Sequence, residues 1–419
     1  MKIIAVKYFI LILFCAQASV FAGKVPAIIP AKSLPDSIPW NLKSLSRPPE
    51  FKLLDCNDRI WSLTYHGESF QEKPFTEVFA YYSTPGILSG NPKKDRNLPA
   101  IVLVHGKGGT AYKQWVEMWA SRGYAAIAMD LNGSTPGRKK LLNGGPAIDP
   151  NAFSKINLPI THQWPYHGVA NVIKAHSLLM SFKEVDSSRT AITGISWGGY
   201  VTCIAAGIDN RFKAAVPVYG CGFLYEDSRW KNQFAQLTAD DRNKCITLWD
   251  PSSYTASTSV PIFFISGTDD FAYPLASMIK TFELIKGQRN IRITPHMKHS
   301  HPAGWNPKEI FYFIDQYLND GKPIPQITSP VMQDNKAIAI LISKTKPKSV
   351  KLNYTFDSNP SEDRKWQTID ANISKNTITA PLPPNTAVWF FTVKDEHDCI
   401  ISSRPFRDPD SNISWHLSL

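Results

Sequence analysis

Runs of consecutive apolar residues recur through most of the chain. Such short runs are typical of strands buried on both faces of a sheet. The runs lie at residues 100–104, 125–129, 214–218 and 262–265, and two further strands are predicted at 189–193 and 291–294. Segments with apolar residues at helical spacing separate them, the longest over 165–182 and others over 275–285 and 307–318. Strands that alternate with helices predict a mostly parallel sheet covered by helices on both faces.

The periodicity changes after Gly321. Residues 322–325 form a Pro-rich linker, and beyond it apolar and polar residues alternate, most clearly through residues 350–356. Comparable runs lie at 337–342, 366–371, 377–380, 387–393 and 400–403. Short strands at this regular spacing predict an immunoglobulin- or fibronectin-like β-sandwich over residues 326–419, after an α/β domain at residues 23–325.

Two alternating runs precede the first buried strand, at residues 60–65 and 76–83 within the segment 57–84. Polar residues separate the two runs, and a Pro-Gly pair follows the second one. This pattern predicts an antiparallel hairpin at the edge of the sheet.

The first 22 residues have the organisation of a secretory signal peptide. Lysines precede an apolar run at residues 8–14, and cleavage after Ala18 or Ala22 fits the small residues that follow. The apolar run is too short to span a bilayer, and no later segment has the length and apolarity to do so. The sequence therefore predicts a cleavable signal peptide at residues 1–22, a secreted or periplasmic protein, and no membrane span.

The chain carries a formal net charge of +11. A positive excess favours either an acidic polymer such as a uronic-acid-bearing glycan or a basic surface that only aids solubility. No dense run of Lys and Arg and no basic helix face accompanies the charge. The sequence therefore favours scattered surface charge and predicts no nucleic-acid partner.

The cysteines that follow the predicted signal peptide are irregularly spaced, which is not the pattern of a disulfide framework. A secreted protein could still pair two of them. Cys221 and Cys245 are the candidate pair because of their modest separation.

Residues 194–198 read Gly-Ile-Ser-Trp-Gly and follow the predicted strand at 189–193. This sequence between a strand and a helix is typical of a nucleophile elbow, in which the serine lies at the tip of a strained turn. The flanking glycines avoid collisions with the neighbouring strand and helix. Ser196 is therefore the candidate nucleophile, although the pentapeptide alone also fits a glycine-rich turn with a solvated serine.

A serine hydroxyl needs a histidine to accept its proton and a carboxylate to hold that histidine. Asp270 follows a buried strand, three residues after a glycine and four before a proline, a spacing that favours it over Asp269. His299 follows the last predicted strand and precedes a small residue. His299 is therefore the candidate base, ahead of His301 and then His296.

The histidine-rich loop also allows a second interpretation, weak metal binding. No carboxylate and cysteine spacing around it forms a recognisable zinc site. The sequence therefore predicts no metal and no other cofactor.

An acyl-transfer site also needs backbone N–H groups that bind the oxyanion. Trp197 follows the candidate nucleophile at the start of a helix and supplies one such N–H. The second donor is predicted at Lys107, in the His-Gly-Lys-Gly-Gly segment at residues 105–109. His105 is predicted to brace this loop rather than to react.

These motifs resemble those of the α/β-hydrolase superfamily, and within it those of secreted serine esterases of the acetylxylan esterase and dienelactone-hydrolase-like group. The resemblance extends over residues 36–320. It is carried by residues 105–109, 164–167, 194–200, 218–222, 267–274 and 299–305. It implies an α/β-hydrolase fold and hydrolysis of carboxylic esters, often acetyl groups on plant polysaccharides. Dienelactone hydrolases use a cysteine where this chain has Ser196, so their activity is not carried over.

The sequence therefore predicts a serine esterase that acts on acylated carbohydrate through an acyl-enzyme. Residues 187–205 also resemble prolyl-oligopeptidase-type serine peptidases, so a peptidase or amidase is the alternative. A third hypothesis is a glycan-binding protein on an inactive hydrolase scaffold. For the C-terminal domain, a packed accessory role is favoured over glycan contact, because Trp366, Trp389 and Trp415 fit strand-core positions as easily as a sugar platform.

Overall fold

The computed structural model describes residues 25–36, 38–357 and 363–407. The predicted signal peptide at residues 1–22 and Trp415 lie outside the described residues. Within those described ranges, no helix is both long enough and apolar enough to cross a bilayer.

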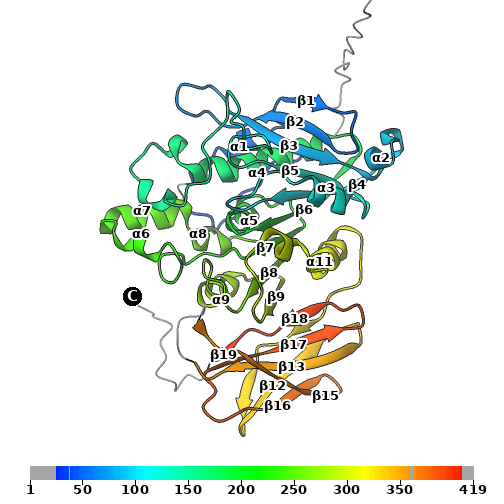
Figure 1. Ribbon diagram of the computed structural model, residues 1–419, viewed down its shortest axis with the longest axis vertical. Coiled ribbons are helices and arrows are strands. Elements are labelled where there is room, and N and C mark those ends of the chain that lie inside the picture. Colours follow the sequence, from blue (N-terminus) through cyan, green and yellow to red (C-terminus); the bar gives the residue numbers. More distant parts are fainter. Residues whose placement is uncertain (1–24, 37, 358–362, 408–419) are drawn as a thin grey trace, which may run out of the picture.

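A nine-stranded sheet forms the centre of the α/β domain (Figure 1). In spatial order its strands are β1 (Phe51–Asp55), β2 (Trp61–His66), β3 (Glu77–Ser83), β5 (Ala125–Met129), β4 (Leu98–Val104), β6 (Val185–Ile195), β7 (Ala214–Val218), β8 (Ile262–Gly267) and β9 (Arg289–Thr294). The strands from β5 to β9 pair in parallel. Because β5, β7 and β8 are buried along their whole length, they need the continuous apolar runs that the sequence shows. The predicted mostly parallel sheet is confirmed.

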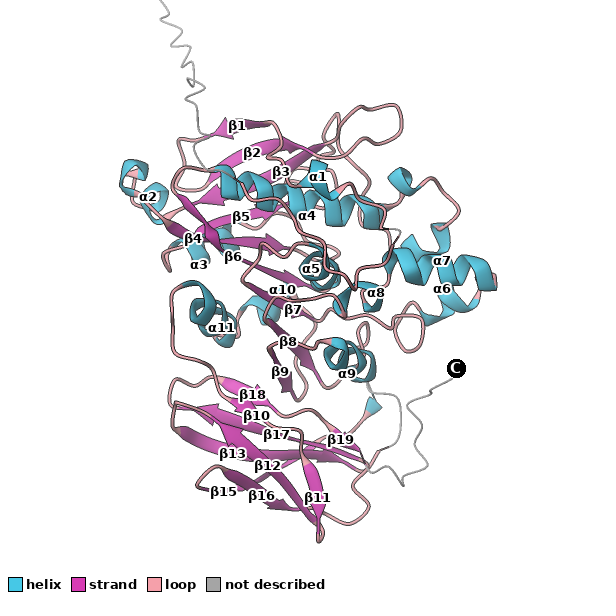
Figure 2. Ribbon diagram, turned by 180° about the vertical axis from the view of Figure 1, so that it is seen from behind, coloured by secondary structure: helices cyan, strands magenta, loops and turns pink. Residues whose placement is uncertain are grey.

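Helices cover both faces of this sheet (Figure 2). On one face α3 (Lys113–Ala120) and α11 (Glu309–Leu318) lie together, with the rings of Trp119 and Phe311 6.0 Å apart. On the other face α4 (Trp164–Ser181) and α5 (Trp197–Ile208) pack against each other. The remaining helices are α1 (Leu42–Leu45), α2 (Pro85–Leu88), α6 (Lys231–Ala235), α7 (Ala239–Trp249), α8 (Ser252–Thr255), α9 (Leu275–Leu284) and α10 (His301–Trp305), with 3₁₀ turns at Pro92–Lys94, Ala152–Lys155 and Ile160–His162.

The predicted edge hairpin is present as β2 and β3, which pair antiparallel with Leu63 opposite Ala80. It does not form the edge of the sheet, however, because β1 pairs antiparallel with the outer side of β2. The sequence did not predict β1. Its Lys52, Leu54 and Asp55 side chains are exposed, so the strand has neither a continuous apolar run nor a clean alternation.

Two antiparallel sheets form the C-terminal β domain. The first contains β10 (Gln326–Ile327), β12 (Lys336–Ile342), β16 (Thr377–Pro381) and β15 (Asn372–Ser374), with β11 (Val331–Gln333) beside β12; the second contains β14 (Gln367–Asp370), β13 (Pro347–Thr355), β17 (Val388–Asp395) and β18 (Ile400–Ser402), with β19 (Phe406–Arg407) beside β17. Leu341 and Ile378 of the first sheet share one core with Leu352 and Phe391 of the second. This strand order is that of an immunoglobulin-type sandwich with β14 as an added edge strand, which confirms the predicted architecture.

Two of the three tryptophans considered for glycan contact are buried. Trp389 packs in the sandwich core, with its ring 5.6 Å from that of Phe391. Trp366 packs on Phe390, on the side of the second sheet that faces the α/β domain. Neither ring offers an exposed platform for a sugar.

The β domain covers the β9 edge of the main sheet (Figure 1). Ile293 in β9 donates its N–H to the Ser402 hydroxyl of β18 at 2.8 Å, and that hydroxyl donates to the Ile293 carbonyl at 3.2 Å. Phe390 and Ile401 join the hydrophobic core of the α/β domain. An uncovered edge strand would present unpaired N–H and C=O groups to solvent. The β domain therefore stabilises the strand that leads into the histidine-rich loop.

The candidate disulfide between Cys221 and Cys245 is wrong, because both thiols are free and buried. Cys245 lies in α7, where its Sγ donates to the Phe153 carbonyl at 3.7 Å. Cys221 follows β7, and Cys203 of α5 is its neighbouring thiol. Modest separation in sequence did not bring the two thiols together, because that of Cys245 faces Phe153 in the loop between β5 and α4.

Candidate active site

Ser196 lies at the tip of a tight turn between β6 and α5. Its backbone has φ 59° and ψ −119°, a conformation that residues with side chains rarely adopt. A Cβ on Gly194 would lie 2.3 Å from the carbonyl oxygen of Gly198, and a Cβ on Gly198 would lie 2.0 Å from that of Val104. Only glycine fits at both positions, so the turn has the geometry of a nucleophile elbow.

The three predicted triad residues form one continuous hydrogen-bonded chain. The Nε2 atom of His299 lies 2.9 Å from the Ser196 hydroxyl oxygen, and its Nδ1 atom donates to Asp270 at 2.7 Å. Asp270 is 1% exposed, and its other carboxylate oxygen accepts the N–H groups of Ala272 and Tyr273. Because the carboxylate holds the proton on Nδ1, the lone pair of Nε2 faces the serine hydroxyl.

Aromatic rings hold the imidazole of His299 in place. Tyr219 stacks on it with ring centroids 4.6 Å apart, and Phe271 lies 5.2 Å away. The Tyr219 hydroxyl donates to the carbonyl oxygen of Lys298 at 2.8 Å, which ties the ring to the histidine loop. Sequence reasoning did not assign a role to Tyr219. The signal for it is its place directly after β7, the strand that pairs with the nucleophile strand.

The alternative carboxylate and histidines lie outside this hydrogen-bonded chain. Asp269 accepts a hydrogen bond from His296, whose side chain is 62% exposed. His301 begins α10, and its Nε2 atom accepts the backbone N–H of Gly106 at 3.0 Å. Across the described ranges, His, Cys, Asp and Glu side chains do not gather in any group of three or more that could hold a metal ion.

The loop after β4 packs directly against the nucleophile. A Cβ on Gly106 would lie 2.8 Å from the Cβ of Ser196, so only glycine allows this approach. The N–H groups of Lys107 and Trp197, the predicted oxyanion donors, have no hydrogen-bond acceptor in the described part of the chain. Unpaired backbone N–H groups next to a nucleophilic serine are what an oxyanion hole requires.

His105 braces the same loop. Its Nδ1 atom donates to the Gly106 carbonyl at 2.7 Å, and its Nε2 atom accepts the N–H of Leu131 at 2.9 Å. Burial lowers the pKa of His105 to about 4, so the ring is neutral at neutral pH. Both ring nitrogens are occupied, which leaves none for proton transfer to a substrate.

Two protein-family models match parts of this chain. Residues 59–233 match the family model for acetyl xylan esterase (AXE1), and residues 155–320 match that for the prolyl oligopeptidase family. The solved structure of an acetyl xylan esterase from Paenibacillus sp. R4 superposes with a TM-score of 0.53 and 21% sequence identity, covering 66% of this chain and 92% of that chain. The chain has the α/β-hydrolase fold.

Two curated proteins of different activity are similar to this chain. The chain is 24% identical over 248 residues to dipeptidyl aminopeptidase BIII of Pseudoxanthomonas mexicana. The aligned region covers 52% of this chain and 32% of that protein. The chain is 20% identical over 255 residues to the acetyl esterase Axe7A of Xylanibacter ruminicola. This alignment covers 55% of this chain and 54% of that protein. The chain thus spans about a third of the first relative's length and about half of the second's.

An aromatic cluster surrounds Trp197, the residue that follows the candidate nucleophile. Its ring lies 5.6 Å from Phe153, 5.0 Å from Trp164 and 4.9 Å from Trp230. Phe153 comes from the long loop between β5 and α4, and Trp230 from the segment before α6. All four side chains are buried. The two loop segments therefore place bulky apolar rings next to the residue that follows the nucleophile.

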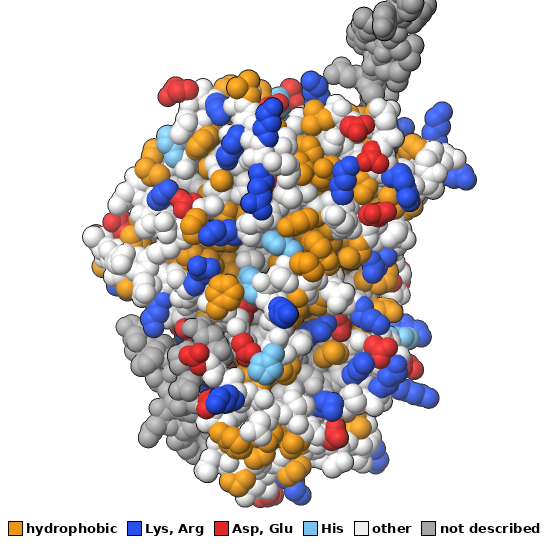
Figure 3. Space-filling model, viewed as in Figure 1, with side chains coloured by type: hydrophobic (Ala, Val, Ile, Leu, Met, Phe, Trp, Pro, Cys, Tyr) orange, Lys and Arg blue, Asp and Glu red, His pale blue; other side chains and the backbone are white. Residues whose placement is uncertain are grey.

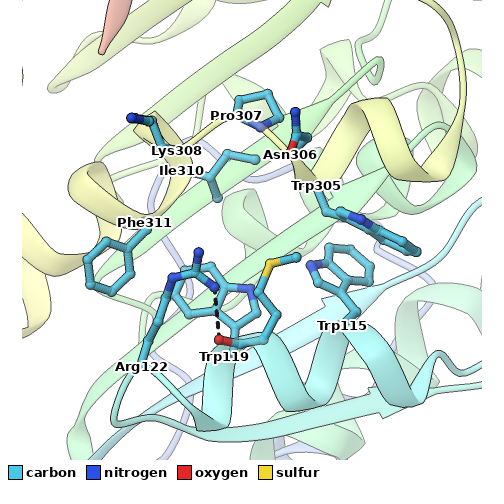
Figure 4. Close-up of a pocket in the computed structure, with 10 residues that line it drawn as sticks. Trp115, Trp119, Arg122, Trp305, Asn306, Pro307, Lys308, Ile310 and Phe311 are labelled. Atoms are coloured by element: carbon cyan, nitrogen blue, oxygen red, sulfur yellow. Dashed lines mark hydrogen bonds between the residues drawn. The ribbon is translucent and has the colours of Figure 1, made fainter. Parts of the chain in front are cut away.

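A separate cavity lies between α3 and the segment that contains α10 and α11 (Figure 4). It is lined by Trp115, Met118, Trp119, Arg122, Trp305, Asn306, Pro307, Lys308, Ile310 and Phe311. None of these residues belongs to the triad or supplies an oxyanion donor. The ring of Trp305 lies 6.4 Å from that of His301, and Tyr112 lies within 5.2 Å of both rings, so aromatic side chains link the cavity to the residue that holds Gly106.

Proposed function

We propose that this α/β-hydrolase is a serine esterase that removes short acyl groups, acetyl groups first of all, from acylated carbohydrate. The observation that carries the proposal is the unbroken chain from Ser196 through His299 to Asp270, at 2.9 and 2.7 Å, beside two unpaired backbone N–H groups. This arrangement supplies a nucleophile, a general base and an oxyanion site in one place.

In the first half of the reaction, His299 Nε2 takes the hydroxyl proton of Ser196 as the serine oxygen bonds to the ester carbonyl carbon. The N–H groups of Lys107 and Trp197 stabilise the negative charge that forms on the carbonyl oxygen. Asp270 stabilises the imidazolium through the bond to Nδ1. His299 then gives its proton to the leaving alcohol, and the acyl group remains on the serine.

In the second half, His299 takes a proton from water as the water oxygen bonds to the carbonyl carbon of the acyl-enzyme. Collapse of the tetrahedral intermediate breaks the bond to the Ser196 oxygen, which recovers the proton from Nε2. The carboxylic acid leaves, and the free enzyme is restored.

Two observations support a short acyl group. Trp197, the residue that follows the nucleophile, packs in a buried aromatic cluster with Phe153 and Trp230. The similar proteins include an acetyl xylan esterase and an acetyl esterase. We expect these packed rings to disfavour longer acyl chains, because extra methylenes would have to displace well-packed side chains.

The proposal is tested with p-nitrophenyl esters of increasing acyl length and by acetate release from acetylated xylan. We expect kcat/KM to be highest for acetate and to fall as the chain lengthens. Ser196→Ala should lower it by at least about 10⁴-fold while Ser154→Ala, a change at an exposed serine, leaves it unaltered. Absence of turnover of every ester by the purified wild-type protein would contradict the proposal.

A serine peptidase is the second candidate, favoured by the match of residues 155–320 to the prolyl oligopeptidase family and by the likeness to a dipeptidyl aminopeptidase. The same triad would attack an amide carbonyl, with His299 donating a proton to the leaving amine. Turnover of alanyl-prolyl p-nitroanilide at a higher kcat/KM than p-nitrophenyl acetate would favour this candidate over the esterase.

We also propose that the enzyme acts outside the cytoplasm, as a secreted or periplasmic protein. The support is the signal-peptide pattern of residues 1–22. Sequencing the N-terminus of the protein recovered from the exported fraction should give a chain that begins after Ala18 or Ala22. Recovery of the intact chain from the cytoplasm alone would contradict export.

A further inference from the structure

Four cationic side chains surround the candidate active site. Lys107 belongs to the loop that supplies an oxyanion donor, and Lys298 directly precedes the triad histidine. Arg138 donates from Nη2 to the Gly108 carbonyl at 3.2 Å, which places its guanidinium over the same loop. All of these side chains are exposed.

The fourth cation, Arg229, lies on the other side of the triad. Its guanidinium carbon is 5.5 Å from the ring centroid of Phe271, and that ring lies 5.2 Å from the imidazole of His299. Phe271 is 49% exposed, although it is a large apolar side chain beside the catalytic histidine. An exposed aromatic ring and a guanidinium therefore lie together beside the triad histidine.

Within the described residues, none of these four charges is held in an ion pair with a carboxylate, and Lys107 interacts with Asp149 only at longer range. Of the nearby carboxylates, Asp149 is paired with Lys155 and Asp269 with His296. On the face shown in Figure 3, Lys and Arg side chains lie on several sides of the histidines at its centre.

We propose that the substrate of this esterase is an anionic glycan, and that Lys107, Arg138, Arg229 and Lys298 bind the carboxylate groups of its uronic acid residues. The inference rests on the proposed esterase function and narrows its substrate class. Unpaired cations around an active site raise the local concentration of an anionic polymer. Arginine also binds carboxylates in a bidentate manner. The excess of Lys and Arg over Asp and Glu in the chain acts in the same direction over longer distances.

The test compares two chemically acetylated polymers of matched acetyl content, polygalacturonic acid and the uncharged polymer galactan. The measured quantity is the ratio of kcat/KM for acetate release from the anionic polymer to that from the neutral one. We expect a ratio above about 10 at an ionic strength of about 20 mM, falling several-fold at about 500 mM because salt screens the attraction. In the double variant Arg138→Gln/Arg229→Gln the ratio at low salt should fall by about tenfold.

The matched control is Arg59→Gln/Arg96→Gln. Both arginines are exposed and hydrogen-bonded to backbone carbonyls, as Arg138 is, but they precede β2 and β4 at the amino-terminal side of the sheet, opposite the catalytic loops. Their replacement removes the same charge and should leave the ratio unchanged. A ratio near one in the wild-type protein, or an equal fall in the control variant, would overturn the inference while leaving the esterase proposal intact. Absence of acetate release from both polymers and from p-nitrophenyl acetate would instead overturn the esterase proposal itself.

Discussion

The Nε2 atom of His301 accepts a hydrogen bond from the backbone N–H of Gly106 at 3.0 Å. His301 comes two residues after His299, the histidine that contacts Ser196. Burial lowers the pKa of His301 to about 4, so the imidazole is neutral and remains an acceptor at neutral pH. Gly106 precedes Lys107, a predicted oxyanion donor. His301 therefore positions the oxyanion loop, whereas His299 exchanges protons with the nucleophile.

Replacing His301 should lower kcat without removing the base. In His301→Phe the Gly106 N–H loses its acceptor, and we expect kcat to fall by about 10-fold to 100-fold with little change in KM. His301→Gln, which keeps an acceptor oxygen, should restore most of the activity. The pH dependence of kcat/KM should keep the wild-type shape in both variants, because His299 is unchanged. A loss as large as that of His299→Ala would instead assign proton transfer to His301.

Neighbouring carboxylates should respond very differently to the same substitution. Asp270→Asn removes the charge that holds the proton on Nδ1 of His299 and should lower kcat by about 10⁴-fold. Asp269→Asn changes an exposed pair with His296 and should stay within about twofold of the wild type. Both values come from kcat measurements on p-nitrophenyl acetate. Similar losses in the two variants would contradict the triad as described.

The close approach of Gly106 to the nucleophile predicts a selective effect on catalysis. A Cβ at this position would lie 2.6 Å from the Ile195 carbonyl oxygen and 2.8 Å from the Cβ of Ser196. Gly106→Ala should therefore displace the oxyanion loop and lower kcat by about 10²-fold or more. Gly137→Ala is the matched control, because a Cβ there meets only Thr135, at 3.9 Å. Equal activity of the two variants would show that the loop tolerates displacement.

The sequence predicted the central strands of the sheet because their signal is local. Strands buried on both faces need continuous apolar runs, and the runs at 125–129 and 214–218 coincide with β5 and β7. β1 was missed because Leu54 and its polar neighbours are exposed. α10 was missed because it is a five-residue helix, too short for a periodicity to be visible.

The candidate triad could be located from the sequence because each residue follows a strand in a fixed chain order. The choice between His299 and His301 was harder, because both lie in one loop and only the start of α10 separates them. The stacking of Tyr219 on His299, and that of Phe153 on Trp197, depend on contacts between distant segments. Such contacts leave no periodic trace along the chain, so spacing alone could not predict them.

Acidification should destabilise the protein through His176, which is fully buried in α4. Its Nδ1 atom donates to Asp209 at 2.9 Å, and its Nε2 atom lies 2.8 Å from the Thr190 hydroxyl. Burial lowers the pKa of His176 to about 4, against the opposing attraction of Asp209. The histidine of the unfolded chain has a pKa of about 6.5. Between these values the unfolded state binds a proton that the folded state does not.

The contribution of His176 to the free energy of unfolding should therefore fall by about 1.4 kcal/mol per pH unit as the pH drops from about 6.5 to 4. Above about pH 6.5 this contribution is fully present. Urea unfolding across this window measures the slope. His176→Gln should reduce the slope by that amount. Phe212→Leu removes the ring that stacks on His176 at 3.7 Å but removes no titratable group. It should therefore lower the free energy of unfolding equally at every pH. An unchanged slope in His176→Gln would refute the assignment.

Two ion pairs near the junction of the domains should differ sharply in their contribution to stability. Glu309 is 1% exposed, pairs with Arg292 and accepts the N–H of Ile400 in β18. Glu309→Ala leaves a largely buried guanidinium and a backbone N–H without their acceptor, so we expect a loss of about 3–5 kcal/mol. The pair between Arg404 and Glu283 joins the same two domains, but its side chains are 37% and 45% exposed.

Glu283→Ala should therefore cost less than about 1 kcal/mol, because solvent already screens its pair with Arg404. Urea unfolding followed by tryptophan fluorescence compares the two variants under one set of conditions. If the Glu309 contacts couple the β domain to β9, their loss should also make the β domain exchange its amide hydrogens faster than in the wild type, since separation exposes the edge that β18 covers. Equal losses of stability in Glu309→Ala and Glu283→Ala would show that burial of the Glu309 carboxylate does not govern the junction.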